Sequence, residues 1–316
     1  MRRGARIPRR PPARGAGDHR ASDPAIQARR KADRIDLNAL VLGARGQLGS
    51  ELARLLPGAG VTAPIHEKDV IEELLDDRRP DIVINCAAYN AVDRAETEGD
   101  AAHAANVAGP AVVAAACRRT GASLVHFSTN FVFDGSLDRP YVEADEPAPI
   151  SAYGESKLAG ERMVFGSGAR VLVIRTAAVF GGPRSFPRRI LERATSADRI
   201  PVVGDQLINP TYARDLAEAT LELVERDFTG IVHVVGGGCA GWDVFARAAL
   251  EEFGVRTQVD SVPTEAFPTA ARRPRNGCLD TTRFHALRPW QEALHSWAAE
   301  VQQTPPHSSG GQGSGA

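Results

Sequence analysis

Strand-like apolar runs alternate with helical segments between residues 37 and 176. The clearest runs are LNALVLG, DIVINCAA, ASLVHFST and ARVLVIRT, at 37–43, 81–88, 122–129 and 169–176. Runs that are apolar throughout suit strands buried on both faces of a parallel sheet. The stretches between them have helical character, at 43–56, 67–77, 94–119 and 151–165. This alternation predicts an α/β fold with a doubly wound parallel sheet.

The pattern becomes less regular after residue 180. Helices are predicted near 186–197, 211–226, 242–253 and 289–302, with a strand at 231–235. We therefore expect a first domain at 36–180, which 209–235 rejoins, and a smaller mixed α/β C-terminal substrate domain formed by 181–208 and 236–302.

Both ends of the chain differ in composition from this body. Residues 1–34 contain ten Arg and one Lys against three Asp, about +8, so the remainder carries about −9. An acidic body argues against nucleic acid as a partner. Residues 1–35 lack an apolar signal core, so we expect a disordered basic leader; a polyanion-binding arm and a transit peptide stay open as readings. Residues 303–316 are expected to form a flexible tail.

Cysteine usage and hydropathy bear on the compartment. The four cysteines, Cys86, Cys117, Cys239 and Cys278, are widely spaced without a CxxC pair. This favours buried thiols in a reducing compartment over disulfides or zinc, and hence a cytoplasmic protein. The eight His show no ligand spacing, so no metal is predicted. No apolar run is long enough to span a bilayer, so no membrane partner is expected.

A glycine-rich turn connects the first strand to the first helix. Gly43, Gly46 and Gly49 have GxxGxxG spacing in GARGQLGSEL. Glycines at such a turn let backbone N–H groups approach a pyrophosphate at the positive end of the helix. The strand–turn–helix context predicts a Rossmann-type dinucleotide-binding domain, with NADPH or NADH as the cofactor.

The acidic residue that usually follows the second strand of such a domain is not evident. The segment PGAGVTAP ends without Asp or Glu, and Glu67 and Asp69 lie later, at a helix start. That carboxylate normally binds the adenosine ribose of NAD, so its absence here indicates that NADP is at least tolerated. Arg45 inside the loop could meet the 2′-phosphate of NADP or be an ordinary solvated cation.

A hydroxyl, a tyrosine and a lysine are predicted to meet at the edge of the sheet. Ser128, Thr129 and Asn130 end a strand, and ligands of doubly wound folds bind beyond the carboxyl ends of strands. Tyr153 and Lys157, in SAYGESK, are four residues apart and so share one helix face. A nearby cation favours the phenolate and is expected to lower the pKa of Tyr153. Such a tyrosine can exchange a proton with a carbonyl oxygen.

Several motifs in order resemble the extended short-chain dehydrogenase/reductase superfamily. They are GARGQLG, NCAAYNAVDRAE, STNFVFDG, YGESKLAGE and ARRPRNGCLD, within about residues 38–302. Within the superfamily they are most similar to the dTDP-4-dehydrorhamnose reductase family. The resemblance implies an NAD(P)H-dependent sugar-nucleotide ketoreductase of dTDP-rhamnose biosynthesis, which transfers hydride to C4 of a dTDP-4-keto-6-deoxyhexose. A homodimer is a possible assembly.

The resemblance also implies roles for individual residues. It makes Tyr153 the general acid, Lys157 its partner and a cofactor ribose ligand, and Thr129 the hydroxyl that holds the carbonyl. The implied cofactor contacts are Gly43, Arg45, Gly46, Gln47, Leu48, Gly49, Ala87, Ala88 and Tyr89, together with Tyr153 and Lys157. The implied substrate contacts are Thr129, Asn130, Ala178, Arg273 and Arg275, with Arg272 nearby. Asn106 is expected behind the active site, in a structural or a catalytic role.

Two positions and one segment depart from the family pattern. The family usually has Asp after the Ser-Thr pair, where this chain has Asn130, and a Trp where this chain has Ala178. The second strand region is also shortened. The first two changes fall on substrate positions, so a related 4-keto-6-deoxy sugar nucleotide remains open as the substrate.

Two other functions fit the same motifs. An epimerase of the superfamily would keep NAD bound through its cycle. A non-catalytic NADP-binding regulatory subunit, like the β subunit of methionine adenosyltransferase, shares the RPRNGCLD segment. The intact Thr129, Tyr153 and Lys157 favour an enzyme over the regulatory subunit.

Overall fold

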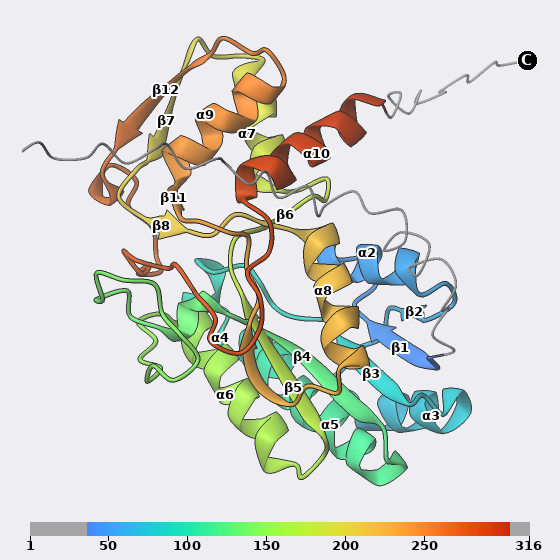
Figure 1. Ribbon diagram of the computed structural model, residues 1–316. Coiled ribbons are helices and arrows are strands. Elements are labelled where there is room, and N and C mark those ends of the chain that lie inside the picture. The colour runs from blue at the N-terminus through green and yellow to red at the C-terminus, as the bar shows by residue number, and fades with distance from the viewer. Residues whose placement is uncertain (1–36, 304–316) are drawn as a thin grey trace, which may run out of the picture. The chain divides into compact units, whose positions relative to one another are not determined.

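A six-stranded parallel sheet forms the centre of the part that the computed structural model describes, residues 37–303 (Figure 1). The expectations for residues 1–36 and 304–316 lie outside this part. The strand order is β10-β5-β4-β3-β1-β2. The chain adds β2 on one side of β1 and then β3, β4, β5 and β10 in turn on the other side. The predicted α/β class and doubly wound parallel sheet are confirmed.

The strands alternate with helices along the chain. The strands are β1 (Ala39–Leu42), β2 (Gly60–Val61), β3 (Ile82–Asn85), β4 (Ser123–Thr129), β5 (Val171–Thr176), β6 (Val179–Phe180), β7 (Arg199–Val203), β8 (Leu207–Ile208), β9 (Thr211–Tyr212), β10 (Gly230–His233), β11 (Ala240–Gly241) and β12 (Gln258–Val262). The helices are α2 (Gln47–Leu55), α3 (Lys68–Arg78), α4 (Gly99–His103), α5 (Gly109–Thr120), α6 (Ala152–Gly166), α7 (Phe186–Ala194), α8 (Ala213–Glu225), α9 (Trp242–Glu252) and α10 (Trp290–Gln303).

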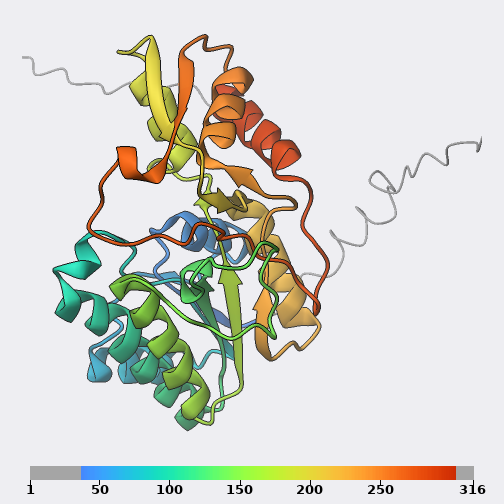
Figure 2. The same ribbon diagram turned by 90° about the vertical axis from the view of Figure 1, so that its left-hand side faces the viewer.

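Helices cover both faces of the sheet. Figures 1 and 2 show α3, α5 and α6 packed side by side on one face, and α2 and α8 on the other. Strands β3 and β5 are buried at every position, as continuous apolar runs between two helical layers should be. The main core joins Leu40 and Leu42 of β1, Val83 of β3 and Leu124 of β4 with apolar residues of α3 and α5.

The helix predicted at 94–119 is interrupted. A 3₁₀ turn at Arg94–Glu96 precedes α4, and a π-helical turn at Ala104–Ala108 leads into α5. Pro110 lies in the first turn of α5, where a missing backbone N–H is tolerated. The π-helical turn turns Asn106 inward, where its side chain is fully buried.

The C-terminal half adds short elements that the apolar pattern did not reveal. Strands β7 and β12 pair in parallel outside the main sheet, and α7 and α9 pack together beside them. Their shared core is aliphatic, and an adjoining buried cluster contains the aromatic residues Phe180, Phe245, Trp290 and Trp297. Strand β10 returns to the main sheet and pairs with β5. The domain boundaries given above stay a prediction.

The pairing of the cysteines corrects one expectation. Cys239 and Cys278 are joined by a disulfide, whereas Cys86 and Cys117 are free. The chain brings the pair together because Asn209 donates to the carbonyl oxygens of Gly238 and Leu279, which flank the two cysteines. Contacts between segments 39 residues apart cannot be read from cysteine spacing. Cys86 is half-buried rather than buried.

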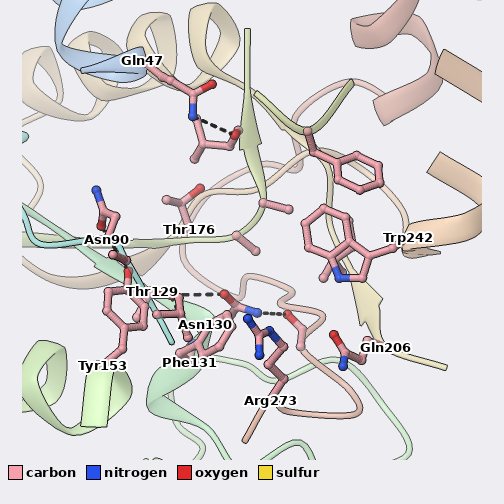
Figure 3. A pocket seen from close by; sticks show the side chains of 18 of the residues that line it. Gln47, Asn90, Thr129, Asn130, Phe131, Tyr153, Thr176, Gln206, Trp242 and Arg273 are labelled. Carbon is pink, nitrogen blue, oxygen red and sulfur yellow. Dashed lines mark hydrogen bonds between the residues drawn. The ribbon is translucent and has the colours of Figure 1, made fainter. Parts of the chain in front are cut away.

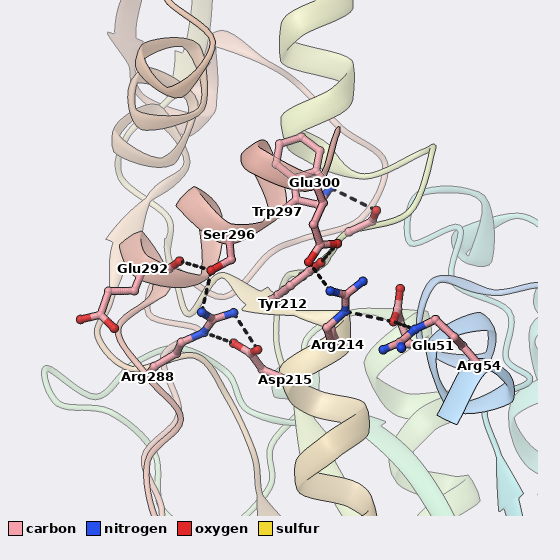
Figure 4. A network of polar contacts seen from close by, with 11 residues as sticks. Glu51, Arg54, Tyr212, Arg214, Asp215, Arg288, Glu292, Ser296, Trp297 and Glu300 are labelled. Atoms are coloured by element: carbon pink, nitrogen blue, oxygen red, sulfur yellow. Dashed lines mark hydrogen bonds and ion pairs between the residues drawn. The ribbon is translucent and has the colours of Figure 1, made fainter. Parts of the chain in front are cut away.

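A polar network links three helices on the side of the sheet that carries α2. Arg214 of α8 lies between Glu51 of α2 and Glu300 of α10, and Tyr212 donates to the same Glu300 (Figure 4). In the same view Arg288 forms two hydrogen bonds with Asp215. The helix that follows the glycine loop is thereby tied to the C-terminal helix. Within residues 37–303 no helix combines the length and the apolar character needed to cross a bilayer.

Candidate active site

The first turns of α6 carry Tyr153 and Lys157 into the protein. Ser151 caps the helix, because its hydroxyl oxygen accepts from the backbone N–H of Gly154 at 3.2 Å. Tyr153 is 8 % exposed and its ring meets Phe131 edge-on at 5.5 Å. Lys157 is 2 % exposed, and its Nζ donates to the carbonyl oxygen of Phe127 on β4 at 2.7 Å.

The small residues of SAYGESKLAGE allow this helix to pack closely. A Cβ on Gly154 would lie 2.3 Å from the carbonyl oxygen of Phe131, and one on Gly160 would lie 2.1 Å from that of Asn106. Both approaches are with backbone, which cannot give way as a side-chain tip can. The face that carries Tyr153 and Lys157 is therefore fixed against the loop after β4 and against the π-helical turn.

Asn106 holds the surroundings of this helix in place. Its amide oxygen accepts from the backbone N–H of Tyr89, and its amide nitrogen donates to the Tyr89 carbonyl and the Ser156 hydroxyl. These bonds link the loop after β3 to α6, which is the behaviour of a structural residue.

The pKa of Tyr153 differs from the expectation. Burial raises it to about 12, and the hydroxyl of Thr129 beside it offsets only part of that rise. The lowering expected from Lys157 is not found: Thr129, and not Lys157, is the group that lowers the pKa of Tyr153, and burial outweighs it. A phenol with this pKa is protonated at neutral pH, which is the form that can give a proton to a substrate. Burial lowers the pKa of Lys157 to about 8, although the carboxylate of Glu161 opposes that shift.

The glycine loop has the shape of a phosphate cradle. Gly43 has φ of +77°, and a Cβ there would lie 2.7 Å from the backbone nitrogen of Ala87. A Cβ on Gly49 would lie 2.2 Å from the carbonyl oxygen of Gly43. The start of α2 therefore packs directly on the turn, with free backbone N–H groups at the helix end. Gln47 donates to the Val179 carbonyl oxygen, as Figure 3 shows, and accepts from the backbone N–H of Gly182, so its side chain fixes the loop to β6 and the segment after it.

A cavity of about 990 Å³ brings these parts together (Figure 3). Of the residues predicted for the site, it is lined by Gly46, Gln47, Leu48, Gly49, Ala88, Thr129, Asn130, Tyr153, Lys157, Ala178 and Arg273. The remaining predicted residues, Gly43, Arg45, Ala87, Tyr89 and Arg275, are not among its lining. Gly43 and Ala87 instead pack against each other at the base of the glycine loop. Arg45 lies outside, where its Nε donates to the Thr62 hydroxyl just after β2.

Comparison with known proteins fits this geometry. The family described as RmlD substrate binding domain matches residues 37–303. The dTDP-4-dehydrorhamnose reductase of Aggregatibacter actinomycetemcomitans is 36% identical, over 83% of this chain and 99% of its own length. The chain belongs to the dTDP-4-dehydrorhamnose reductase family.

Other relatives agree with this membership. A spore coat polysaccharide biosynthesis protein of Bacillus subtilis is 38% identical over 83% of this chain and 96% of its own length. The structure of the Bacillus anthracis reductase in complex with NADP is 33% identical over 83% of this chain and 98% of that chain, with a TM-score of 0.79. The expected NAD(P)-dependent oxidoreductase class is confirmed at the level of the family.

Asn130 occupies the position where reductases of this family usually have Asp. Its amide oxygen accepts from the Thr129 hydroxyl at 3.2 Å, and its amide nitrogen donates to the carbonyl oxygen of Gly277 at 2.9 Å (Figure 3). Both ends of the amide are thus used inside the protein. Asn130 orients Thr129 and ties the end of β4 to the RPRNG segment that lines the cavity.

We expect Asn130→Asp to destabilise the protein in a pH-dependent way. A carboxylate would face the Gly277 carbonyl without a proton to donate, at a cost of about 1–3 kcal/mol. Burial raises the pKa of a carboxyl group, so the protonated form can still donate and the cost grows as pH rises. Urea unfolding of the variant and wild type at pH 5.5 and pH 8 measures this difference. An identical loss at both pH values would contradict the hydrogen-bond assignment, with Asn130→Ala as the pH-independent control.

Arg273 is engaged rather than free to hold a substrate. Its guanidinium forms two hydrogen bonds with the carboxylate of Asp93, at 2.6 and 3.0 Å, and also donates to Thr269. Asp93 belongs to the loop after β3, so this pair bridges two segments at the edge of the cavity. Arg272 and Arg275 are exposed and do not line the cavity. None of the three arginines of the RRPRN segment has a free guanidinium facing the cavity.

Sequence reasoning missed several residues of the lining. Phe186, Arg189 and Arg193 come from α7, Arg184 from just before it, and Trp242 from the start of α9. The signal available was the run FPRRILER, in which an aromatic residue and two arginines recur at helical spacing. Among the described residues that line the cavity there is no Asp or Glu, while Lys157, Arg184, Arg189, Arg193 and Arg273 contribute cations.

Proposed function

We propose that this chain reduces the 4-keto group of a dTDP-4-keto-6-deoxyhexose with NADPH or NADH, with dTDP-4-dehydrorhamnose as the first candidate substrate. One observation carries the proposal: Thr129, Tyr153 and Lys157 line a single cavity whose charged residues are all cationic, in a protein whose body is acidic. A cavity of one sign attracts ligands of the other, and a sugar nucleotide is anionic. The names of the relatives support the same substrate class.

The residues present fit a dinucleotide cofactor. Gly46, Leu48 and Gly49 would hold the diphosphate, because they line the cavity at the N-terminal end of α2, which no side chain caps. Lys157 would bind the ribose next to the nicotinamide. Bound NADPH or NADH supplies the hydride for the sugar carbon.

The chain's own groups handle the proton and orient the carbonyl. Tyr153, kept protonated by its raised pKa, gives its phenolic proton to the C4 oxygen. Thr129 lies beside Tyr153, and its hydroxyl donates to the same oxygen when its one proton turns from the Asn130 amide to the substrate. Lys157 is protonated below about pH 8 and stabilises the phenolate that Tyr153 becomes.

A substrate panel tests the proposal. Purified protein is mixed with NADPH or NADH and a set of dTDP-4-keto-6-deoxy sugars, and absorbance loss and product identity are recorded. We expect oxidation of the cofactor only when a keto-sugar nucleotide is present. Cofactor retained through purification, with interconversion of sugars and no net oxidation, would instead identify an epimerase. A stoichiometric enzyme partner without reductase activity would identify a regulatory subunit.

Arg45 is expected to favour NADPH over NADH. Its Nε donates to the hydroxyl of Thr62, directly after β2. That position has no carboxylate to bind the adenosine ribose of NAD, and the Arg45 guanidinium can pair with the 2′-phosphate of NADP. We expect Arg45→Ala to raise the KM for NADPH about tenfold, an effect of about 1.4 kcal/mol, with little change for NADH. The ratio of kcat/KM for the two cofactors measures this. An equal change in kcat/KM for NADPH and NADH would show that Arg45 supports the loop and does not bind the 2′-phosphate.

A further inference from the structure

One face of helix α7 lines the cavity and carries an aromatic residue and two arginines. Phe186, Arg189 and Arg193 are three and four residues apart, so they lie along one side of the helix, and all three line the cavity. Pro187 and Ile190 bury the helix against the C-terminal core. The arginines are therefore held on a fixed element of the C-terminal part.

These arginines have no counter-charge. Within residues 37–303, no carboxylate lies within 4 Å of the guanidinium of Arg184, Arg189 or Arg193, and no side-chain hydrogen bond engages them. Arg273, by contrast, is satisfied by Asp93. Cations left without partners beside a cavity free of carboxylates can take up an anion at little desolvation cost to other groups. The planar fork of Arg suits phosphate oxygens in pairs.

An aromatic wall adjoins the arginines. The rings of Phe186 and Trp242 lie 4.6 Å apart at 53°, and both residues line the cavity, where Figure 3 shows Trp242 facing its interior. Aromatic side chains offer large flat apolar surfaces on which a planar ring can pack. A ligand that is aromatic at one end and doubly anionic next to it, as a nucleoside diphosphate is, matches this order of groups.

We propose that Arg189 and Arg193 bind the diphosphate of the substrate nucleotide, with Phe186 and Trp242 against its base. This inference rests on the proposed function for the identity of the ligand, and it places arginine contacts with the substrate on α7, where the family resemblance implied Arg273 and Arg275. The RPRNG segment is instead held in place at the edge of the cavity by two contacts: Asn130 donates to the Gly277 carbonyl oxygen, and Arg273 pairs with Asp93. It does not form the anion site.

Equilibrium binding of dTDP and dTMP tests the assignment without any turnover. Wild-type protein is expected to bind dTDP more tightly than dTMP, because the second phosphate reaches the arginines. Arg189→Ala with Arg193→Ala is expected to weaken dTDP binding about 10- to 100-fold, as for the loss of charge-assisted hydrogen bonds, and to bring the two affinities together. Arg256→Ala, an exposed arginine of the same C-terminal part that lies outside this cavity, is the matched control and should bind as wild type does.

Three outcomes decide between the possibilities. Unchanged dTDP affinity in the double variant overturns the assignment, even if wild type reduces a keto-sugar nucleotide. Weakened NADPH binding with unchanged dTDP binding also overturns it, because the arginines would then serve the cofactor. Loss of dTDP affinity in a protein that reduces no keto-sugar nucleotide supports the diphosphate site and instead removes the proposed reaction.

Discussion

Tyr153→Phe is expected to lower kcat for sugar reduction by about 10²–10⁴-fold, the contribution usual for a positioned general acid. The phenol is the proton donor that the cavity offers next to Thr129, and its raised pKa keeps the proton in place until the carbonyl oxygen gains charge. Phe preserves the edge-on contact with Phe131 and so leaves the packing intact. Single-turnover oxidation of NADPH at saturating substrate measures the loss in the chemical step.

A matched tyrosine gives the control for this prediction. Tyr212→Phe removes a buried phenol that donates to Glu300 and that is not among the residues lining the cavity. It is expected to cost stability but to leave kcat within a factor of about two. If Tyr153→Phe kept more than a tenth of the wild-type rate, the proton would have to come from another group and the proposed mechanism would be wrong.

Glu161→Gln is expected to lower the free energy of unfolding by about 3–5 kcal/mol, the usual cost of removing one partner of a buried ion pair. Glu161 and Arg175 are 3 % and 2 % exposed, and two hydrogen bonds of 2.9 and 2.7 Å join them between α6 and β5. The substitution would leave a buried guanidinium without a counter-charge. Denaturant unfolding of purified protein gives the change directly.

The same substitution should also move the activity on the pH scale. The carboxylate of Glu161 raises the pKa of Lys157 against the larger effect of burial, so its removal lowers that pKa further below about 8. If the protonated amine is required, activity falls as pH rises through this pKa, and the alkaline limb of kcat/KM moves to lower pH.

A double substitution separates the cost of the unpaired charge from the cost of altered packing. Replacing Glu161 by Met together with Arg175 by Leu removes both charges, and stability should recover most of the loss because no buried ion is left unpaired. A double variant as unstable as Glu161→Gln alone would show that packing, and not the unpaired charge, sets the cost.

The sequence was sufficient for the parts of the site that depend on local order. The apolar runs located β1, β3, β4 and β5, and parallel strands place their carboxyl ends at one edge, so Thr129 and the glycine loop could be expected there. The spacing of Tyr153 and Lys157 placed both on one helix face. Their close packing on Phe131 and Asn106 also has a local cause, the glycines at 154 and 160.

Contacts between distant segments could not be predicted in this way. Arg273 was expected at the substrate, but a carboxylate 180 residues earlier in the chain takes its guanidinium. The pairing of Cys239 with Cys278 depends on how Asn209 joins two loops. The lowered pKa expected for Tyr153 was wrong because burial raises it and Lys157 does not act on it, and burial is a property of the whole fold.

The packing of α6 has a consequence for how this enzyme can change. Its catalytic face is also the face that fits backbone to backbone at Gly154 and Gly160, so almost any substitution there damages chemistry and folding together. Helix α7 presents Arg189 and Arg193 to the cavity, and both side chains are solvent-exposed and form no ion pair among the described residues. If the proposed diphosphate site is correct, Arg189 and Arg193 can be exchanged one at a time to tune the affinity for the nucleotide while the proton donor stays unchanged.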